Sequence, residues 1–384
     1  MYLGIIEGYY GKPYTHRQRR MLLEELSQMG SPVYFYAPKD DPWHRILWRE
    51  PYPEEEWREL TGCMGGATSF FFSVSPWQFQ DGQWRMASEK LLRAEDSGAA
   101  GLGILFDDVP EESAGELARR QLEFAGRALE RTELPVVLCP SVYCTELMER
   151  YPGGGEYLQA WRKCIPSGWS SFWTGPGVVS RELSSLGSAE ELLGSPVVVW
   201  DNLHATDWCL RRVYLGGLSG RRPPGHSWLV NTSEVFPAAL HSVMELRAAG
   251  GLPREWPAGL GEPSPGWQLM EEFHHDPWNP GETGGEILAR LKEALDGPGT
   301  REATEWLQGA VADMDSFTRD LSVIEGGWQL LPVARDLFRT LSILLRALNS
   351  SDPRKTLHYL MEERLPYENP LAALASGFTD RRNP

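Results

Sequence analysis

Short apolar runs alternate with longer amphipathic stretches over about the first 235 residues, and this alternation predicts an α/β protein with a closed (β/α)8 TIM barrel. Polar residues follow each of the predicted strands, as expected where eight strand ends form one functional face. The strand signal disappears after about Gly251, which predicts a helical region there. An open, doubly wound sheet is the alternative, but the sequence has neither a dinucleotide-binding glycine motif nor a phosphate-binding loop.

Eight segments have the apolar, β-branched or aromatic character of buried strands. The predicted strands are Tyr2–Ile6, Pro32–Tyr36, Ser69–Val74, Gly101–Phe106, Pro135–Leu138, Trp169–Trp173, Pro196–Trp200 and Ser227–Val230. Helical patterns lie between most of them, at Arg17–Met29, Glu54–Cys63, Ser88–Glu95, Ala114–Glu130 and Ala189–Leu193. Eight strands within about 250 residues agree in number and size with a single barrel domain.

The rest of the chain has a different composition and hydrophobic pattern. A Pro/Gly-rich passage from Gly251 to Gly266 precedes amphipathic patterns at Gly284–Leu295, Arg301–Leu321, Trp328–Leu348 and Arg354–Glu363. We therefore predict a barrel domain over residues 1–255 and a small all-α domain of three or four helices over residues 256–384. Its leucine-rich stripes are expected to pack internally, although a second apolar face would serve as a dimer surface.

Composition limits the classes of partner. A formal net charge of -16 argues against nucleic acid and against anionic membrane surfaces. Five cysteines without CxxC spacing, no signal-like segment after Met1 and no apolar run of eighteen residues predict a cytoplasmic protein with reduced thiols. The sixteen tryptophans suit sugar rings, but they fit an ordinary core equally well.

Two adjacent acids, Asp107 and Asp108, end the predicted fourth strand. Like charges so close repel, so we expect one carboxyl to hold a proton near neutral pH while the other stays ionised. Such a pair supplies a proton donor and a charge stabiliser at one site. A helix-capping or metal-binding pair is an equally good interpretation of this motif alone, although no His or Cys lies nearby in sequence to support a metal.

Other strand ends carry similar chemistry. Lys39 precedes two acids after the second predicted strand, and Trp200 precedes Asp201 and Asn202 after the seventh. Amide and carboxylate groups beside an indole ring can bind several hydroxyls while the ring covers a sugar face. His204 is expected to be structural, and the run His274-His275-Asp276 is expected to be a loop feature rather than a metal cluster.

Six segments at or near strand ends form an ordered set. They are Glu7-Gly8-Tyr9-Tyr10-Gly11-Lys12-Pro13, Tyr36-Ala37-Pro38-Lys39-Asp40-Asp41, Phe106-Asp107-Asp108, Cys139-Pro140-Ser141-Val142-Tyr143, Trp173-Thr174-Gly175-Pro176 and Trp200-Asp201-Asn202-Leu203-His204-Ala205-Thr206-Asp207. In this order they resemble the family-84 glycoside hydrolases, which are the O-GlcNAcases and related β-N-acetylglucosaminidases. The resemblance runs from residue 4 to about residue 245.

The resemblance implies a retaining, metal-independent reaction without a cofactor, in which the substrate supplies the nucleophile. Asp107 would polarise the acetamido group, whose carbonyl oxygen attacks the anomeric carbon to form an oxazoline. Asp108 would protonate the departing oxygen and later activate water. This scheme differs from the usual pair of carboxylates in retaining glycosidases, of which one is the nucleophile.

The resemblance also assigns substrate contacts. By this likeness Gly8, Lys39, Asp207 and Asn231 would bind the sugar hydroxyls, and Asn202 would lie beside the acetamido group. Tyr143 would bond near the oxazoline oxygen. The acetamide pocket and its mouth would be shaped by Cys139, Thr174, Val178 and Trp200.

Three segments depart from the family pattern. The tyrosine of a Pro-Thr-Glu-Tyr motif remains as Tyr143, but the neighbouring acid is lost. An Asn-Pro-Asn motif keeps only Asn231, and a Ser-Pro-Gly motif ends in Trp77, whose ring would narrow the cleft or add a stacking surface. None of these changes affects the aspartate pair.

The leading prediction is therefore an exo-β-N-acetylglucosaminidase that removes GlcNAc from glycosides, including GlcNAc on Ser or Thr of glycoproteins. An enzyme for free oligosaccharides or cell-wall fragments would share the same catalytic residues. A barrel that binds sugar without turnover is the alternative of another class. A homodimer through the helical domain is a further prediction from the resemblance.

Overall fold

The computed structural model describes residues 1–108, 114–183, 186–209, 212–297, 301–361 and 370–379. They form two compact units. The first comprises residues 1–203, 218–234 and 243–254, and the second comprises residues 204–217, 235–242 and 255–384.

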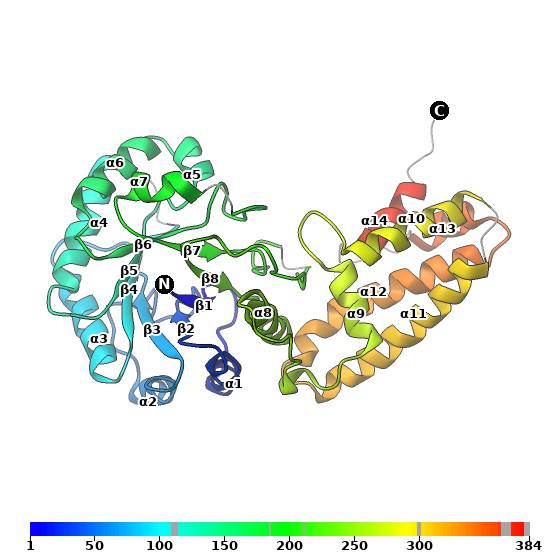
Figure 1. Cartoon of the computed structure of the whole chain (residues 1–384), viewed down its shortest axis with the longest axis horizontal. Helices are drawn as coiled ribbons and strands as arrows, with labels where there is room; N and C mark the ends of the chain where they lie inside the picture. Colours follow the sequence, from blue (N-terminus) through cyan, green and yellow to red (C-terminus); the bar gives the residue numbers. More distant parts are fainter. Residues whose placement is uncertain (109–113, 184–185, 210–211, 298–300, 362–369, 380–384) are drawn as a thin grey trace. The chain divides into compact units, whose positions relative to one another are not determined.

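The first unit contains a closed barrel of parallel strands, which confirms the predicted fold. The strands are β1 (Leu3–Glu7), β2 (Val33–Tyr36), β3 (Ser69–Val74), β4 (Gly101–Leu105), β5 (Val136–Cys139), β6 (Ser170–Trp173), β7 (Val197–Asp201) and β8 (Ser227–Asn231). Each strand pairs with the next, and the barrel closes where Gly4 lies opposite Val33 of β2 on one side and Leu229 of β8 on the other. Figure 1 shows helices α1–α7 around these strands.

The helices that follow the strands cover the outside of the barrel. They are α1 (His16–Ser27), α2 (Glu54–Thr61), α3 (Trp84–Asp96), α4 (Ala114–Ala128), α5 (Thr145–Arg150), α6 (Gly154–Cys164), α7 (Ala189–Leu193) after the 3-10 turn η1 (Leu186–Ser188), and α8 (Phe236–Ala249). α1 begins with a capping box, because Thr15 and Gln18 satisfy each other's backbone N–H groups. The sequence patterns did not predict α5 and α6, which fold between β5 and β6.

The barrel interior is filled by apolar side chains, one to three from each strand or its end. This buried cluster comprises Ile6, Val33, Phe35, Ala37, Phe71, Leu105, Val137, Cys139, Phe172, Val198, Trp200 and Leu229. Inward-facing residues fill a small barrel as a solid core, so the chemistry must lie at the strand ends. Cys139 and Trp200 belong to this core and also reach that end, which fixes both rigidly.

The second unit contains the C-terminal helices. They are α9 (Pro265–Phe273), α10 (Glu282–Asp296), α11 (Arg301–Asp320), α12 (Gly327–Leu348), α13 (Pro353–Met361) and α14 (Pro370–Thr379), with 3-10 turns η2 (Ala258–Leu260) and η3 (Leu321–Val323). The Trp267 ring of α9 packs edge-on against Phe317 of α11, with ring centroids 5.0 Å apart. The prediction of three or four helices did not include α9 and α14.

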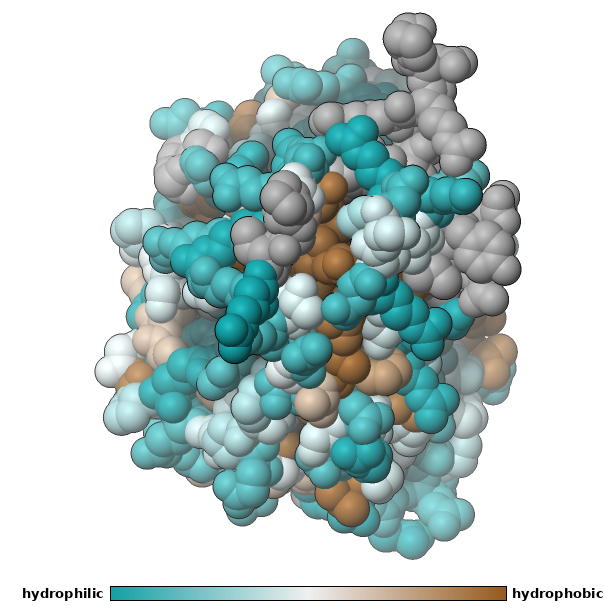
Figure 2. All heavy atoms as spheres, turned by 90° about the vertical axis from the view of Figure 1, so that its right-hand side faces the viewer, coloured by the Kyte–Doolittle hydropathy of each residue, from teal (hydrophilic) through white to brown (hydrophobic). Residues whose placement is uncertain are grey.

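One side of the helical unit is displayed in Figure 2, where hydrophilic side chains cover most of the surface and apolar ones gather in a strip near the middle. Trp328, at the start of α12, is 69% exposed. Dimerisation through this unit stays a prediction. Within the described residues, no helix is long and apolar enough to cross a membrane.

Candidate active site

The paired aspartates lie in a turn directly after β4, and their side chains have different surroundings. Asp107 is buried, whereas Asp108 is exposed. Asp108 has a φ of 57°, in the left-handed region that Asp adopts more readily than most residues. The chain reversal therefore directs one carboxyl into the barrel mouth and leaves the other accessible.

Asp107 forms a buried ion pair. Its Oδ2 accepts a hydrogen bond from Nζ of Lys39, which is also buried and lies 5.2 Å from the centroid of the Trp200 ring. Its other oxygen, Oδ1, is buried and accepts no hydrogen bond from the described residues. Since buried polar atoms normally have partners, this oxygen is free to accept a bond from a bound ligand.

Asp108 is bound by two tyrosine hydroxyls. Tyr10 donates to Oδ2 at 2.7 Å, and Tyr143 donates to Oδ1 at 3.1 Å. Burial, followed by the charge of Asp108, raises the pKa of both tyrosines. The hydroxyls therefore keep their protons through neutral pH and remain donors.

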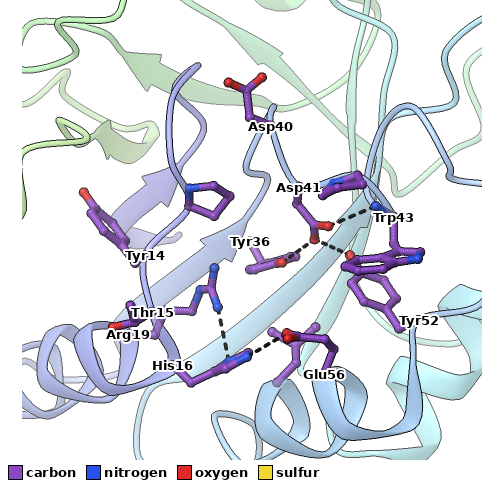
Figure 3. A pocket seen from close by; sticks show the side chains of 13 residues that line it. Tyr14, Thr15, His16, Arg19, Tyr36, Asp40, Asp41, Trp43, Tyr52 and Glu56 are labelled. Carbon is purple, nitrogen blue, oxygen red and sulfur yellow. Dashed lines mark hydrogen bonds and ion pairs between the residues drawn. The ribbon is translucent and has the colours of Figure 1, made fainter.

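The turn after β2 fixes Lys39 through its two neighbouring acids. Asp41 is buried and accepts hydrogen bonds from the hydroxyls of Tyr36, at 2.5 Å, and Tyr52, at 2.6 Å, and from the backbone N–H of Trp43. Figure 3 shows Asp41 directed into this cluster and Asp40 pointing away from it.

Asp40 instead accepts from the backbone N–H of Gly11. The cavity beside the cluster has a volume of about 340 Å³, and neither Asp107 nor Asp108 lines it. We therefore assign Asp41 to holding the turn rather than to chemistry.

A network of amide groups joins the ends of β1, β7 and β8. Asn202 accepts at Oδ1 from Nε1 of Trp200 at 2.8 Å and from Nδ2 of Asn231 at 2.9 Å, and it donates to the carbonyl of Val178 at 2.8 Å. Asn231 in turn accepts from the backbone N–H of Gly8 at 3.0 Å. A Cβ atom at Gly8 would lie 2.3 Å from the Trp200 ring, so only glycine permits this approach.

The ends of β5 and β6 complete the mouth of the barrel. Cys139 is buried, and burial and the charge of Asp107 raise the pKa of its thiol, which stays neutral. The backbone N–H of Thr174 donates to the carbonyl of Tyr143 at 2.9 Å, and its hydroxyl donates to Gly177. Thr174 therefore orders the loops that carry Tyr143 and Val178.

Eleven of the twelve predicted site residues thus lie in the first unit, where contacts link them at the strand ends. Asp207 is assigned to the second unit, and its Oδ1 accepts from the backbone N–H of Trp208. Its contact with sugar stays a prediction. Asp201, also at the end of β7, is buried against Arg221 and Trp228 and is structural.

The structure describes the surroundings of both histidines singled out in the sequence, His204 and His274. His204 is buried between the hydroxyl of Ser242 and the carbonyl of Gly216. His274 accepts a backbone bond from Leu215, and burial lowers its pKa to about 3. No group of three or more His, Cys, Asp or Glu side chains suited to a metal occurs in the described part of the chain.

Two residues close to Asp108, Tyr10 and Arg45, are not among the predicted site residues. Tyr10 lies within the first motif, so its position after β1 was a usable signal. Arg45 follows β2, and its guanidinium reaches the Asp108 carbonyl at 3.5 Å. No motif marks Arg45, because its partners come from three other segments.

The fold and the site together define a class of protein. A parallel barrel whose mouth holds two adjacent carboxyl groups, one buried and one accessible, beside an indole ring and amide groups has the components of a glycoside hydrolase site.

A family model described as β-N-acetylglucosaminidase matches residues 3–234. The chain belongs to this family, which confirms the resemblance to the family-84 glycoside hydrolases.

Named relatives agree with this assignment. Protein O-GlcNAcases of Rattus norvegicus and Mus musculus are each 30% identical to this chain over 57% of its length. The match covers only 26% of each relative, so the chain spans about a quarter of their length. An O-GlcNAc hydrolase mutant of Thermobaculum terrenum has the same fold, with a TM-score of 0.77, 22% identity, and coverage of 98% of this chain and 93% of its own.

Proposed function

We propose that this chain is a retaining exo-β-N-acetylglucosaminidase that uses the acetamido group of its substrate as the nucleophile. One observation carries the proposal: adjacent carboxyl groups have opposite surroundings. Asp107 is buried against Lys39 with one oxygen unpartnered, and Asp108 is exposed beneath two hydroxyls. The first suits a fixed hydrogen-bond acceptor, and the second suits a group that exchanges protons with a ligand.

In the first step, Oδ1 of Asp107 accepts the acetamido N–H and turns the acetamido carbonyl oxygen toward the anomeric carbon. A bond forms between that oxygen and the anomeric carbon while the bond to the leaving group breaks. Asp108 gives its proton to the departing oxygen. The products are the free alcohol and an oxazolinium ion, whose N–H donates to the charged carboxylate of Asp107.

In the second step, Asp108 takes a proton from water, and the water oxygen attacks the anomeric carbon. The bond between that carbon and the oxazoline oxygen breaks, which restores the acetamido group. Two displacements at one carbon leave the β configuration unchanged. Tyr143 lies beside Asp108 and would bond near the oxazoline oxygen.

The amide network supports the same placement of the sugar. Trp200 would form the wall of the acetamide pocket with Cys139, and Asn202 would lie beside the acetamido group. Gly8, Lys39 and Asn231 line the mouth and would bind the hydroxyls, with Asp207 as a further proposed contact.

We infer that the substrates include GlcNAc linked to Ser or Thr of proteins. The similar proteins named above, a protein O-GlcNAcase and an O-GlcNAc hydrolase, support this substrate. Comparing kcat/KM for a GlcNAc-bearing peptide and for chitobiose decides between glycoproteins and free oligosaccharides. Higher kcat/KM for chitobiose would reject the glycoprotein assignment.

The activity itself is tested with 4-nitrophenyl β-N-acetylglucosaminide. The wild-type chain should release 4-nitrophenol, and proton NMR should detect the β anomer of GlcNAc first. Asp107→Ala and Asp108→Asn should each lower kcat/KM about a hundredfold or more. Undiminished turnover by Asp107→Ala, or the α anomer as first product, would refute the mechanism; tight binding of an oxazoline-like inhibitor without turnover would indicate an inactive sugar-binding barrel.

A further inference from the structure

Arg45 is a buried cation beside Asp108 that the mechanism above does not use. The residue is 5% exposed and lies between β2 and α2. No carboxylate pairs with it among the described residues. Burying a guanidinium costs free energy that its neighbours must offset.

Arg45 contacts three other segments at the barrel mouth. Its Cζ lies 4.7 Å from the centroid of the Trp77 ring and 5.6 Å from that of the Tyr10 ring. Its Nη1 donates to the hydroxyl of Ser75 at 3.2 Å, and its Nη2 makes a longer contact of 3.5 Å with the carbonyl of Asp108. Among the described residues, aromatic faces and neutral oxygens therefore stabilise the guanidinium.

These contacts support Asp108 at its backbone and at its carboxylate. Arg45 reaches its backbone carbonyl directly, and it packs against Tyr10, whose hydroxyl binds the Asp108 carboxylate at 2.7 Å. The left-handed backbone of Asp108, with φ 57°, is unfavourable for a residue with a side chain and needs such support.

We propose that Arg45 is a positioning residue for Asp108, which it holds, together with Tyr10 and Trp77, in the orientation that protonates the leaving group. The inference rests on the proposed acid/base role of Asp108. Trp77 stands where the family pattern has glycine, so the ring that covers Arg45 distinguishes this chain from that pattern. Arg45 does not contact the reacting atoms in this account.

The test compares two aryl β-N-acetylglucosaminides that differ in the acidity of the leaving group. The 3,4-dinitrophenyl leaving group departs with little protonation, whereas the phenyl leaving group needs a proton donor. Arg45→Met should lower kcat/KM about tenfold or more on the phenyl glycoside and less than about threefold on the dinitrophenyl glycoside. A merely structural role would lower both rates by the same factor, and that result would overturn the inference.

Arg49 provides the matched control. It lies in the same segment, 4.6 Å from the centroid of the Trp48 ring, and bonds the side chain of Gln83 and the carbonyl of Gln78. Arg49→Met therefore removes a similar stacked guanidinium without touching Asp108. It should leave the ratio of the two rates at the wild-type value, and a ratio changed as strongly as in Arg45→Met would contradict the proposed specificity.

Trp77→Leu is the second variant, because Arg45→Met removes a buried side chain and can impair folding. Trp77 is only partly buried, and its loss uncovers Arg45 without removing the charge. A selective loss on the phenyl glycoside would support the inference, and an equal loss on both would overturn it. Asp108→Asn tests the proposed role of Asp108 separately. If Asp108 protonates the leaving group, this variant should lose much more kcat/KM on the phenyl glycoside than on the dinitrophenyl glycoside. Equal losses on the two glycosides would contradict the role of Asp108 itself.

Discussion

The two sides of the candidate site are built differently. The side around Asp107 is buried and charged: Lys39 pairs with its carboxylate, and Cys139 and Trp200 belong to the barrel core. The side around Asp108 is exposed and depends on hydroxyl groups and on Arg45. Under the proposed mechanism, the buried side would bind the acetamido group in a rigid pocket, and the exposed side would exchange protons through a carboxyl whose orientation is maintained by its neighbours.

Lys39→Met is expected to have the largest effect on the buried side. The substitution leaves Asp107 buried without its cation, which should lower the free energy of unfolding by about 3–5 kcal/mol and abolish most activity. Urea unfolding and kcat/KM measure the two effects.

The matched control is Arg20→Met, which removes a cation from an exposed ion pair with Glu59. Its unfolding free energy should change by about 1 kcal/mol or less. Equal destabilisation by the two variants would contradict a special role for the buried pair.

Gly8→Ala probes the wall of the same pocket with a smaller change. The added Cβ would lie 2.3 Å from the Trp200 ring, which must shift at a cost of about 1–3 kcal/mol. We expect a higher KM, because the displaced ring would change the shape of the proposed acetamide pocket. Gly30→Ala is the control, since a Cβ there has no neighbour within 4 Å, and its KM should equal that of the wild type.

Tyr143→Phe tests the exposed side and should have the smallest effect. Loss of one hydroxyl bond to the carboxylate of Asp108 should lower kcat/KM about tenfold. Because burial and Asp108 raise the pKa of Tyr143, the wild-type hydroxyl keeps its proton as the pH rises. The factor between variant and wild type should therefore stay constant from about pH 6 to about pH 9, and a factor that disappears toward pH 9 would contradict this.

The comparison also explains which residues the sequence predicted. Asp107, Lys39 and Trp200 each stand at or just after an apolar run, and parallel strands bring their ends together, so proximity follows from topology. Arg45 follows no strand directly, and its contacts with Trp77 and Asp108 depend on how three loops pack. Loop packing has no periodic signal in one sequence.

The same distinction holds for the fold. The strands recur with regular spacing and high apolar content, which made the barrel predictable. α9 begins at Pro265 after the cap Ser264, inside a passage whose Pro and Gly content indicated a loop. α5 has only six residues, too few to show helical periodicity.

The central claim is that Asp107 serves the acetamido group of the substrate, which itself attacks the anomeric carbon. It is tested most directly with 4-nitrophenyl glycosides whose acetamido methyl group carries none, one, two or three fluorine atoms. Fluorine withdraws electrons from the carbonyl oxygen and weakens it as a nucleophile, so kcat/KM should fall with each fluorine added. A rate that does not change across the series would contradict the account.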